Sequence, residues 1–152
     1  MRLSKRGTAQ QDDQTARGLR LIFRAGRRAL GRAESAQTPE VLHEWRKHVK
    51  YLSNALKMID GETMHWRKLV MRTDKLADQL GEDHDLAELE RYVRELKLPG
   101  LQADDCTSVS MLIERRRKTL QKRAFKLGKS IYALKPKNFV RTLLENTSGA
   151  RD

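Results

Sequence analysis

Residues 39–59 read PEVLHEWRKHVKYLSNALKMI, and their apolar side chains recur at alternating intervals of three and four. This interval matches the 3.6-residue turn of an α-helix, so the apolar positions form one stripe that faces a protein core. The stripe consists of Leu42, Trp45, Val49, Leu52, Leu56 and Ile59. Thr38, Pro39 and Glu40 are typical of a helix start, because they supply an N-cap, a first-turn proline and an acid favoured by the helix dipole. An amphipathic helix is predicted over residues 39–60.

Helical spacing continues through most of the chain, and the alternation of β-branched residues that marks strands is absent. Pro39, Pro99 and Pro136 lie between the apolar segments, and Gly81 and Gly100 stand where helices are expected to end. The predicted helices cover residues 12–34, 39–60, 63–80, 83–98, 104–135 and 138–146. The fold class is therefore predicted to be all-α, an antiparallel bundle of about five to six helices with short loops.

One domain is expected from a length of 152 residues. The bundle is predicted to span residues 12–146, with flexible segments at 1–11 and 147–152. No apolar run approaches the ~20 residues of a membrane span. The first residues lack the apolar stretch of a signal peptide, so the expected compartment is the cytoplasm. The single cysteine, Cys106, excludes an internal disulfide and a thiolate metal cluster.

The chain carries 32 Lys plus Arg against 20 Asp plus Glu, which gives a formal net charge of +12. The excess lies in two blocks, since residues 1–57 have a net charge of +8, residues 58–105 of −5 and residues 106–152 of +9. Such a surplus indicates a polyanionic partner: nucleic acid, anionic lipid or a phosphate polymer.

Basic side chains follow the apolar stripe of the predicted helix 39–60. They share an arc of roughly 100° beside the stripe, and five of the six can carry positive charge. The arc contains His43, Arg46, Lys47, Lys50, Asn54 and Lys57. Like charges one turn apart repel each other, so an anion bound there would relieve the repulsion. A simple solvated face is the alternative.

The predicted helix 12–34 repeats this arrangement. Its apolar stripe consists of Leu19, Ile22, Phe23, Gly26 and Leu30, and Gly26 is expected to allow close approach of another helix. Arg20, Arg24 and Arg27 line one flank, and no acid occurs between Asp13 and Glu34. Two helices with unpaired basic flanks favour an anion site.

The predicted helix 104–135 adds arginines within its apolar stripe. The stripe consists of Val109, Leu112, Ile113, Leu120, Ala124, Leu127, Ile131 and Leu134. Arg116 and Arg123 are predicted to project into it, either to pair with acids of the middle helices or to line a basic channel that grips phosphate oxygens. The other basic residues are expected to be solvated on the remaining circumference; they are Arg115, Arg117, Lys118, Lys122, Lys126 and Lys129.

Candidate catalytic and metal groups are few. His43 and His48 lie on separate faces of one helix and make a poor chelating pair, and His65 is expected at the surface. Residues 82–85 (Glu-Asp-His-Asp) either hold a divalent cation or supply acids at a helix start. No Ser-His-Asp order, phosphate-binding glycine loop or paired general acid and base stands out. Binding without catalysis and without a cofactor is expected, and a metal-dependent phosphohydrolase is the enzymatic alternative.

The segments LHEWRKHVKYLSNAL (42–56) and LADQLGEDHDLAEL (76–89) together resemble the CHAD family, the conserved histidine α-helical domain. The resemblance extends over about residues 17–146. It implies a helical bundle whose basic surface binds inorganic polyphosphate. Family members usually contain two helical halves, and this chain resembles the second half alone. The resemblance therefore implies a symmetric homodimer as a way to complete the site.

The resemblance assigns His43, Arg46, Lys47 and Lys50 to the family's histidine motif, and His84 to its second histidine-containing motif. Arg20, Arg24 and Arg27 match the preceding basic helix, and Arg116 and Arg123 match the late helix less closely. With Lys57 from the basic arc, these residues form the predicted polyphosphate site. The protein would then be found at cytoplasmic polyphosphate granules.

The expected affinity falls with salt and rises below about pH 6.5, where His43 gains charge. The alternatives are a nucleic-acid-binding protein that uses the same faces, or an accessory subunit of a phosphate-metabolising enzyme.

Overall fold

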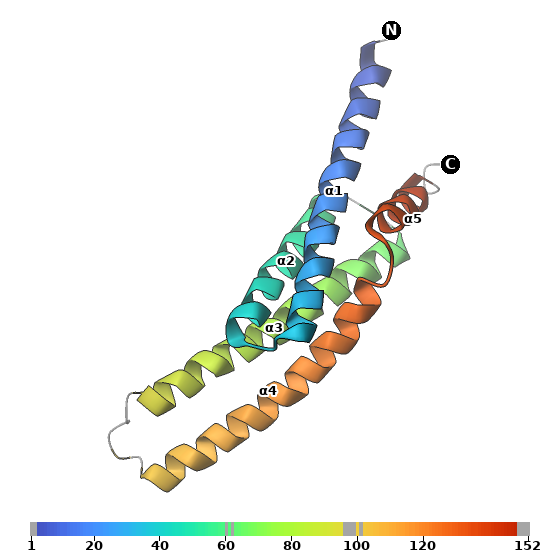
Figure 1. The fold of residues 1–152 in the computed structure, drawn as a ribbon. Helices are drawn as coiled ribbons and strands as arrows, with labels where there is room; N and C mark the ends of the chain where they lie inside the picture. The colour runs from blue at the N-terminus through green and yellow to red at the C-terminus, as the bar shows by residue number, and fades with distance from the viewer. Residues whose placement is uncertain (1–2, 60, 62, 96–99, 101, 149–152) are drawn as a thin grey trace.

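The computed structural model describes residues 3–59, 61, 63–95, 100 and 102–148. Five helices account for most of them, and no β-strand occurs among them; the helices are α1 (Leu3–Ser35), α2 (Pro39–Met58), α3 (Met64–Glu95), α4 (Ala103–Ile131) and α5 (Pro136–Ser148). Figure 1 shows α1 and α2 lying across the longer α3–α4 hairpin, with the short α5 beside α1. The predicted all-α bundle is confirmed.

Within the bundle, the helix boundaries differ from the prediction at Gly81. Gly81 does not end a helix, so the two helices expected over 63–80 and 83–98 are the single helix α3. The reason is packing, because Gly81 is buried and a Cβ added there would lie 3.2 Å from Nε of Arg46. Gly100 does adopt the left-handed conformation that favours glycine, with φ of 88°.

The ends of the bundle also differ from the expected segments. Helix α1 begins at Leu3, well before residue 12, and its first turns project beyond the other helices in Figure 1. Helix α5 ends at Ser148, and residues 149–152 of the predicted tail lie outside the described residues. The start of α2 agrees with the prediction, since the Thr38 Oγ1 accepts a hydrogen bond from the backbone N–H of Val41 at 3.3 Å.

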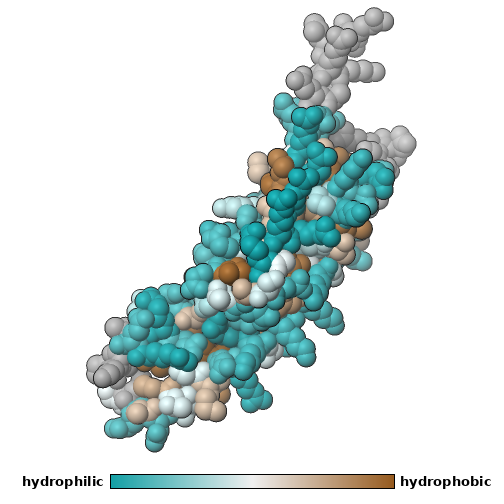
Figure 2. Space-filling model, viewed as in Figure 1, coloured by the Kyte–Doolittle hydropathy of each residue, from teal (hydrophilic) through white to brown (hydrophobic). Residues whose placement is uncertain are grey.

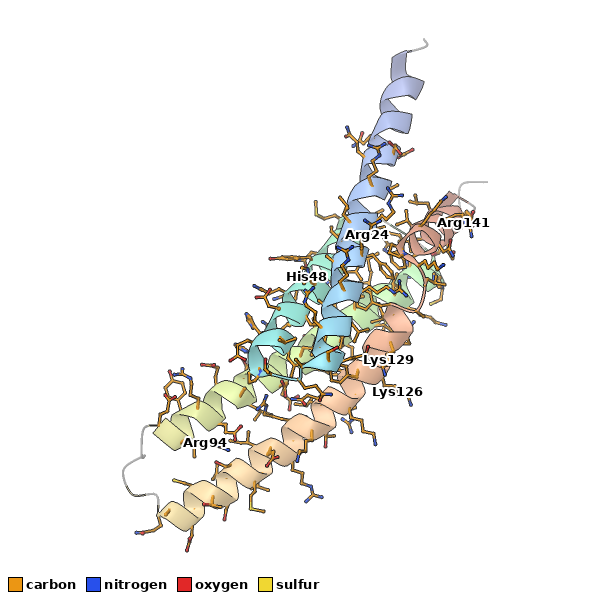
Figure 3. The ribbon with its side chains drawn as sticks, in the orientation of Figure 1. Arg24, His48, Arg94, Lys126, Lys129 and Arg141 are labelled. Atoms are coloured by element: carbon orange, nitrogen blue, oxygen red, sulfur yellow. The ribbon has the colours of Figure 1, made fainter. Side chains whose placement is uncertain are left out.

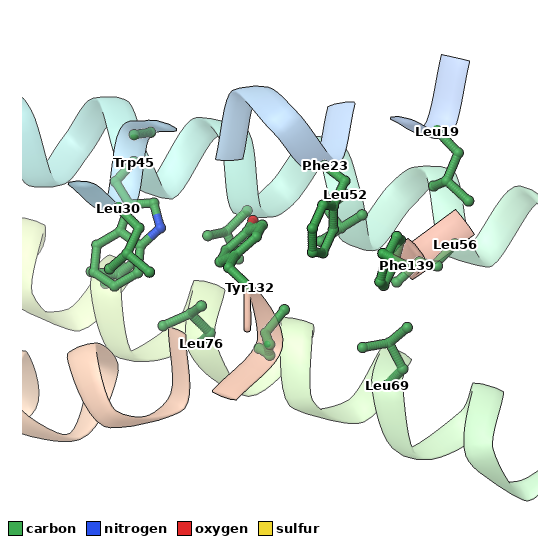
Figure 4. Close-up of a cluster of buried hydrophobic side chains, with 14 of the residues drawn as sticks. Leu19, Phe23, Leu30, Trp45, Leu52, Leu56, Leu69, Leu76, Tyr132 and Phe139 are labelled. Atoms are coloured by element: carbon green, nitrogen blue, oxygen red, sulfur yellow. The ribbon is translucent and has the colours of Figure 1, made fainter. Parts of the chain in front are cut away.

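All five helices contribute to the core, and α4 does so through Ala124 and Ile131 (Figure 4). The predicted stripe of α2 is buried from Leu42 to Leu56, and Ile59 packs against it from just beyond the helix. The stripe of α1 is also confirmed, and its Phe23 ring stacks on Phe139 of α5 with centroids 3.8 Å apart. Gly26 is needed for close approach, because the Tyr132 ring occupies the space that a Cβ would take.

The predicted stripe of α4 is wrong at several positions. Leu112 is 67% exposed and Leu134 is 44% exposed. The buried apolar positions and the small glycine between them are Ile113, Leu120, Ala124, Gly128 and Ile131. In this register Arg117 occupies the interior position, while Arg116 and Arg123 are exposed. The error amounts to one residue, which turns a side chain by about 100° around the helix.

A buried ionic network explains why Arg117 faces inward. Its Nε lies 3.1 Å from Oδ1 of Asp83 and its Nη1 lies 3.4 Å from Oε2 of Glu90. Gln121 donates a further hydrogen bond to the same Asp83 oxygen at 2.8 Å. Asp83 is only 1% exposed, in the middle of α3, so the prediction that it starts a helix is wrong. The network ties α3 to α4.

Replacing Gly128 by alanine is expected to destabilise the fold by about 1–3 kcal/mol. A Cβ at this position would lie 2.5 Å from Cζ2 of Trp45, whose ring is fully buried and has no room to move. Chemical denaturation measures the change. Gly31→Ala is the control, because nothing lies within 4 Å of its added Cβ, and better helix propensity should stabilise that variant by up to about 1 kcal/mol. Equal effects of the two changes would contradict the packing argument.

Candidate functional site

The open seam of the bundle lies between α1 and α4. Helix α1 packs along α2 and α5 but has only a small contact with α4. Two hollows follow this seam and share Glu34 and Lys129 in their linings, and together they are here termed the α1–α4 groove. Figure 3 marks Arg24 on α1 and Lys126 and Lys129 on α4, and Figure 2 shows a mostly hydrophilic surface over these helices.

The charge of the α1–α4 groove is strongly positive. Seven basic side chains line it, against the single acid Glu34; they are Arg24, Arg27, Arg28, Lys118, Lys122, Lys126 and Lys129. Lys129 pairs with Glu34 at 2.8 Å, and Lys118 pairs with Glu114 at 2.8 Å. The other five make no ion pair with any described residue. An anion in the groove would meet several uncompensated charges at once.

The lysines of this groove were missed in the sequence. They are exposed, as expected, but they do not spread over the circumference of α4. Lys118, Lys122, Lys126 and Lys129 follow one another at intervals of four, four and three. This spacing places them in one stripe, with a rise of about 6 Å for every four residues. The stripe is detectable from helical phase, but only the position of α1 makes it one wall of a groove.

Only part of the predicted site lies in the α1–α4 groove. Arg24 and Arg27 line it, as expected for a basic flank of α1. Arg20 is half-buried on the same helix, does not line the groove, and its Nε has no hydrogen-bond partner among the described residues. The remaining predicted residues lie elsewhere in the bundle.

A second basic surface runs along α2 and α3 and is here termed the histidine face. It comprises His43, Arg46, Lys47, Lys50 and Lys57 from α2 and His84 from α3. The rings of His43 and His84 are in contact, with centroids 4.4 Å apart and planes inclined by 38°. The structure thus brings together the two histidines that the sequence motifs singled out.

Some cations of the histidine face are already compensated. Lys47 pairs with Glu44 on the same helix. Lys57 lies 2.8 Å from Oδ1 of Asp74, which also accepts a hydrogen bond from Ser53. Although partial burial opposes ionisation, the Lys57 ammonium and the Ser53 hydroxyl lower the pKa of Asp74. Free charge on this face is therefore concentrated near Lys50 and Arg46.

The environment of His43 makes its protonation difficult. Burial lowers the pKa of His43, and the neighbouring His84, Lys47 and Arg46 lower it further, while Glu44 opposes them. Its Nδ1 is buried without a hydrogen-bond partner among the described residues. The pH range in which His43 gains a charge in the free protein therefore lies below its ordinary value of 6.5.

Acidification is expected to destabilise the protein through His43. The unfolded chain takes up this proton near pH 6.5, before the folded chain does, so stability falls as the pH drops from 6.5 toward the folded pKa. Urea unfolding at about pH 7.5 and about pH 5.5 measures the loss. His43→Gln should lose less stability than the wild type over this range. Parallel profiles of stability against pH for His43→Gln and the wild type would contradict the assignment.

The remaining predicted groups lie on α3 and α4. Arg116 forms an exposed ion pair with Glu82, with 2.6 Å between Nη2 and Oε1. Of the two roles predicted for Arg116, pairing with an acid of the middle helices is therefore the one observed. Arg123 is exposed and lines a different groove, between α3 and α4. The side chains of the acidic segment 82–85 have separate partners, because Glu82 and Asp83 pair with arginines of α4 and His84 contacts His43. No group of three His, Cys, Asp or Glu side chains able to hold a metal ion was found in the described part of the chain.

Comparison with known proteins gives no match: no family model, no curated protein and no solved structure is similar to this chain. Among the described residues, no helix is both long and apolar enough to cross a membrane.

Proposed function

We propose that this protein is a CHAD-like helical bundle that binds inorganic polyphosphate, without converting it, in the α1–α4 groove. The observation that carries the proposal is the lining of that groove, with seven cations against one acid. Lysines of α4 rise by about 6 Å per four residues, and phosphates of a flexible polyphosphate chain lie a few ångströms apart. Successive basic side chains can therefore engage successive phosphates.

The aromatic residues of the groove favour polyphosphate over single-stranded nucleic acid. Proteins that bind single strands stack bases on available aromatic rings. Phe125 stacks on Trp45 with centroids 5.2 Å apart, and Tyr132 is buried against Phe23 with centroids 5.1 Å apart. Both rings are engaged in the core, so the groove offers charge and no free stacking platform within the described lining.

The histidine face enters the proposal through the resemblance to the CHAD family, which assigns polyphosphate contacts to His43, Arg46, Lys47, Lys50 and His84. We infer that two copies of the chain form a symmetric homodimer whose histidine faces line one shared channel, as the resemblance to the second half of the usual CHAD domain implies. Light scattering tests the homodimer. A monomer that still binds polyphosphate tightly would contradict it.

A competition titration tests the proposed function. Labelled polyphosphate is titrated with the protein at two salt concentrations, and unlabelled DNA and RNA are added as competitors. We expect affinity to fall steeply with salt, since each contact releases counterions, and we expect nucleic acid to displace polyphosphate poorly. Efficient displacement at equal phosphate concentration would favour the nucleic-acid alternative instead.

Release of orthophosphate tests whether the protein binds polyphosphate without hydrolysing it. No release of orthophosphate from polyphosphate is expected when Mg²⁺ is added, because Glu82 and Asp83 of the acidic segment 82–85 pair with arginines of α4. Phosphate release that depends on both Mg²⁺ and the protein would support the enzymatic alternative. In cells, the proposed location is the cytoplasmic polyphosphate granule, and imaging of a tagged chain tests it.

A further inference from the structure

A second groove lies between α3 and α4 and is here termed the α3–α4 groove. Its lining comes from two helices that pack closely along their length, and it shares only Lys126 with the α1–α4 groove. The lining residues are Arg72, Lys75 and Gln79 of α3 and Arg123, Lys126, Leu127 and Ser130 of α4. Neither the sequence motifs nor the proposed polyphosphate path accounts for this groove as a whole.

The charge of the α3–α4 groove is entirely positive. Arg72, Lys75, Arg123 and Lys126 line it, and no acidic side chain of the described residues does so. None of the four forms an ion pair with a described residue, although most other arginines of α3 and α4 do so. Their mutual repulsion is left uncompensated within the described structure, and a bound anion would relieve it.

Two polar groups fix the chemistry of the groove. The Arg72 guanidinium donates to the Ser130 hydroxyl, which in turn donates to the Leu127 carbonyl at 2.7 Å, so the guanidinium is held in place before any ligand arrives. Gln79 supplies the opposite polarity, because its Oε1 is buried and accepts no hydrogen bond from a described residue. A fitting ligand must accept from several cations and donate one hydrogen bond to an amide oxygen.

We propose that the α3–α4 groove is a separate site for a terminal phosphate group that carries a proton, in free orthophosphate or at the end of a phosphate chain. Its anionic oxygens accept from Arg72, Lys75 and Arg123, and its P–OH donates to Gln79 Oε1. Phosphates inside a chain have no such proton at neutral pH, and neither does sulfate. The site shares only Lys126 with the polyphosphate path in the α1–α4 groove.

Calorimetric titration near neutral pH tests the site with orthophosphate, and with sulfate as a ligand of equal size that lacks a proton. Lys75→Glu with Arg123→Glu should weaken orthophosphate binding by about tenfold or more. Arg67→Glu with Lys68→Glu changes the net charge equally at exposed α3 positions outside both grooves and should have little effect. Gln79→Leu should remove the preference for phosphate over sulfate.

Two further ligands separate the sources of the terminal group. Linear tripolyphosphate has chain ends, whereas cyclic trimetaphosphate has none, so only the linear form should compete with orthophosphate. Arg24→Glu with Arg27→Glu should leave orthophosphate binding in place, which distinguishes this site from the polyphosphate path. The proposal is overturned if Lys75→Glu with Arg123→Glu binds orthophosphate as the wild type does, or if the control variant Arg67→Glu with Lys68→Glu weakens binding equally. It is also overturned if the wild type binds sulfate and phosphate with the same affinity.

Discussion

Reversal of Arg24 and Arg27 to glutamate is expected to weaken polyphosphate binding by about a hundredfold or more at low salt. Both side chains line the α1–α4 groove, are exposed, and form no ion pair with another described residue, so the loss reflects binding rather than folding. Each removed phosphate contact should also reduce the salt dependence, by about 0.7 in the slope of log affinity against log salt for a single-stranded polyanion. Titration across a salt series measures both effects, and circular dichroism verifies the fold.

Two charge-matched variants make the result specific. Arg67→Glu with Lys68→Glu lowers the net charge by the same amount on an exposed part of α3 outside the groove. This variant should lose only the small part of the polyphosphate affinity that comes from long-range electrostatic attraction. Lys47→Glu with Lys50→Glu tests the histidine face instead. If that variant loses binding while Arg24→Glu with Arg27→Glu binds normally, the binding surface is the histidine face and the groove assignment is wrong.

The fold was accessible from the sequence wherever apolar spacing was regular. The stripes of α1 and α2 and the Thr38 cap were predicted from local pattern, and the structure confirms them. Gly81 was misinterpreted as a helix end. In the sequence, a glycine that leaves room for a neighbouring guanidinium group looks the same as a glycine that stops a helix. Such a distinction depends on a contact between α2 and α3, which no local pattern contains.

The candidate site was accessible only in part, for a similar reason. His43 and His84 were assigned to two separate sequence motifs, and only the structure shows that their rings are in contact. The α4 lysines form a stripe that helical phase predicts, yet their importance depends on α1 lying across the seam. Arg116 and Arg117 are adjacent, and only the partners on α3 decide which of them is buried.

Replacement of Arg117 by methionine is expected to destabilise the fold by about 3–5 kcal/mol. The Arg117 side chain is 14% exposed and the Asp83 side chain 2% exposed, so the change leaves a buried carboxylate with Gln121 as its one remaining partner among the described residues. Glu90 would keep its pair with Arg94 at 2.6 Å, which places most of the loss on Asp83. Urea unfolding near pH 7 measures the free energy.

The adjacent pair supplies the matched control. Arg116 and Glu82 are 49% and 45% exposed, so Arg116→Met should cost no more than about 1 kcal/mol, although it removes the same kind of bond one residue away. Equal losses for the two substitutions would mean that burial of Arg117 is unimportant. The double variant Asp83→Leu with Arg117→Met should recover much of the stability, because a buried ion pair replaced by apolar side chains of similar size is often neutral. Failure to recover would place the loss in packing between α3 and α4, since the uncompensated charge is then absent.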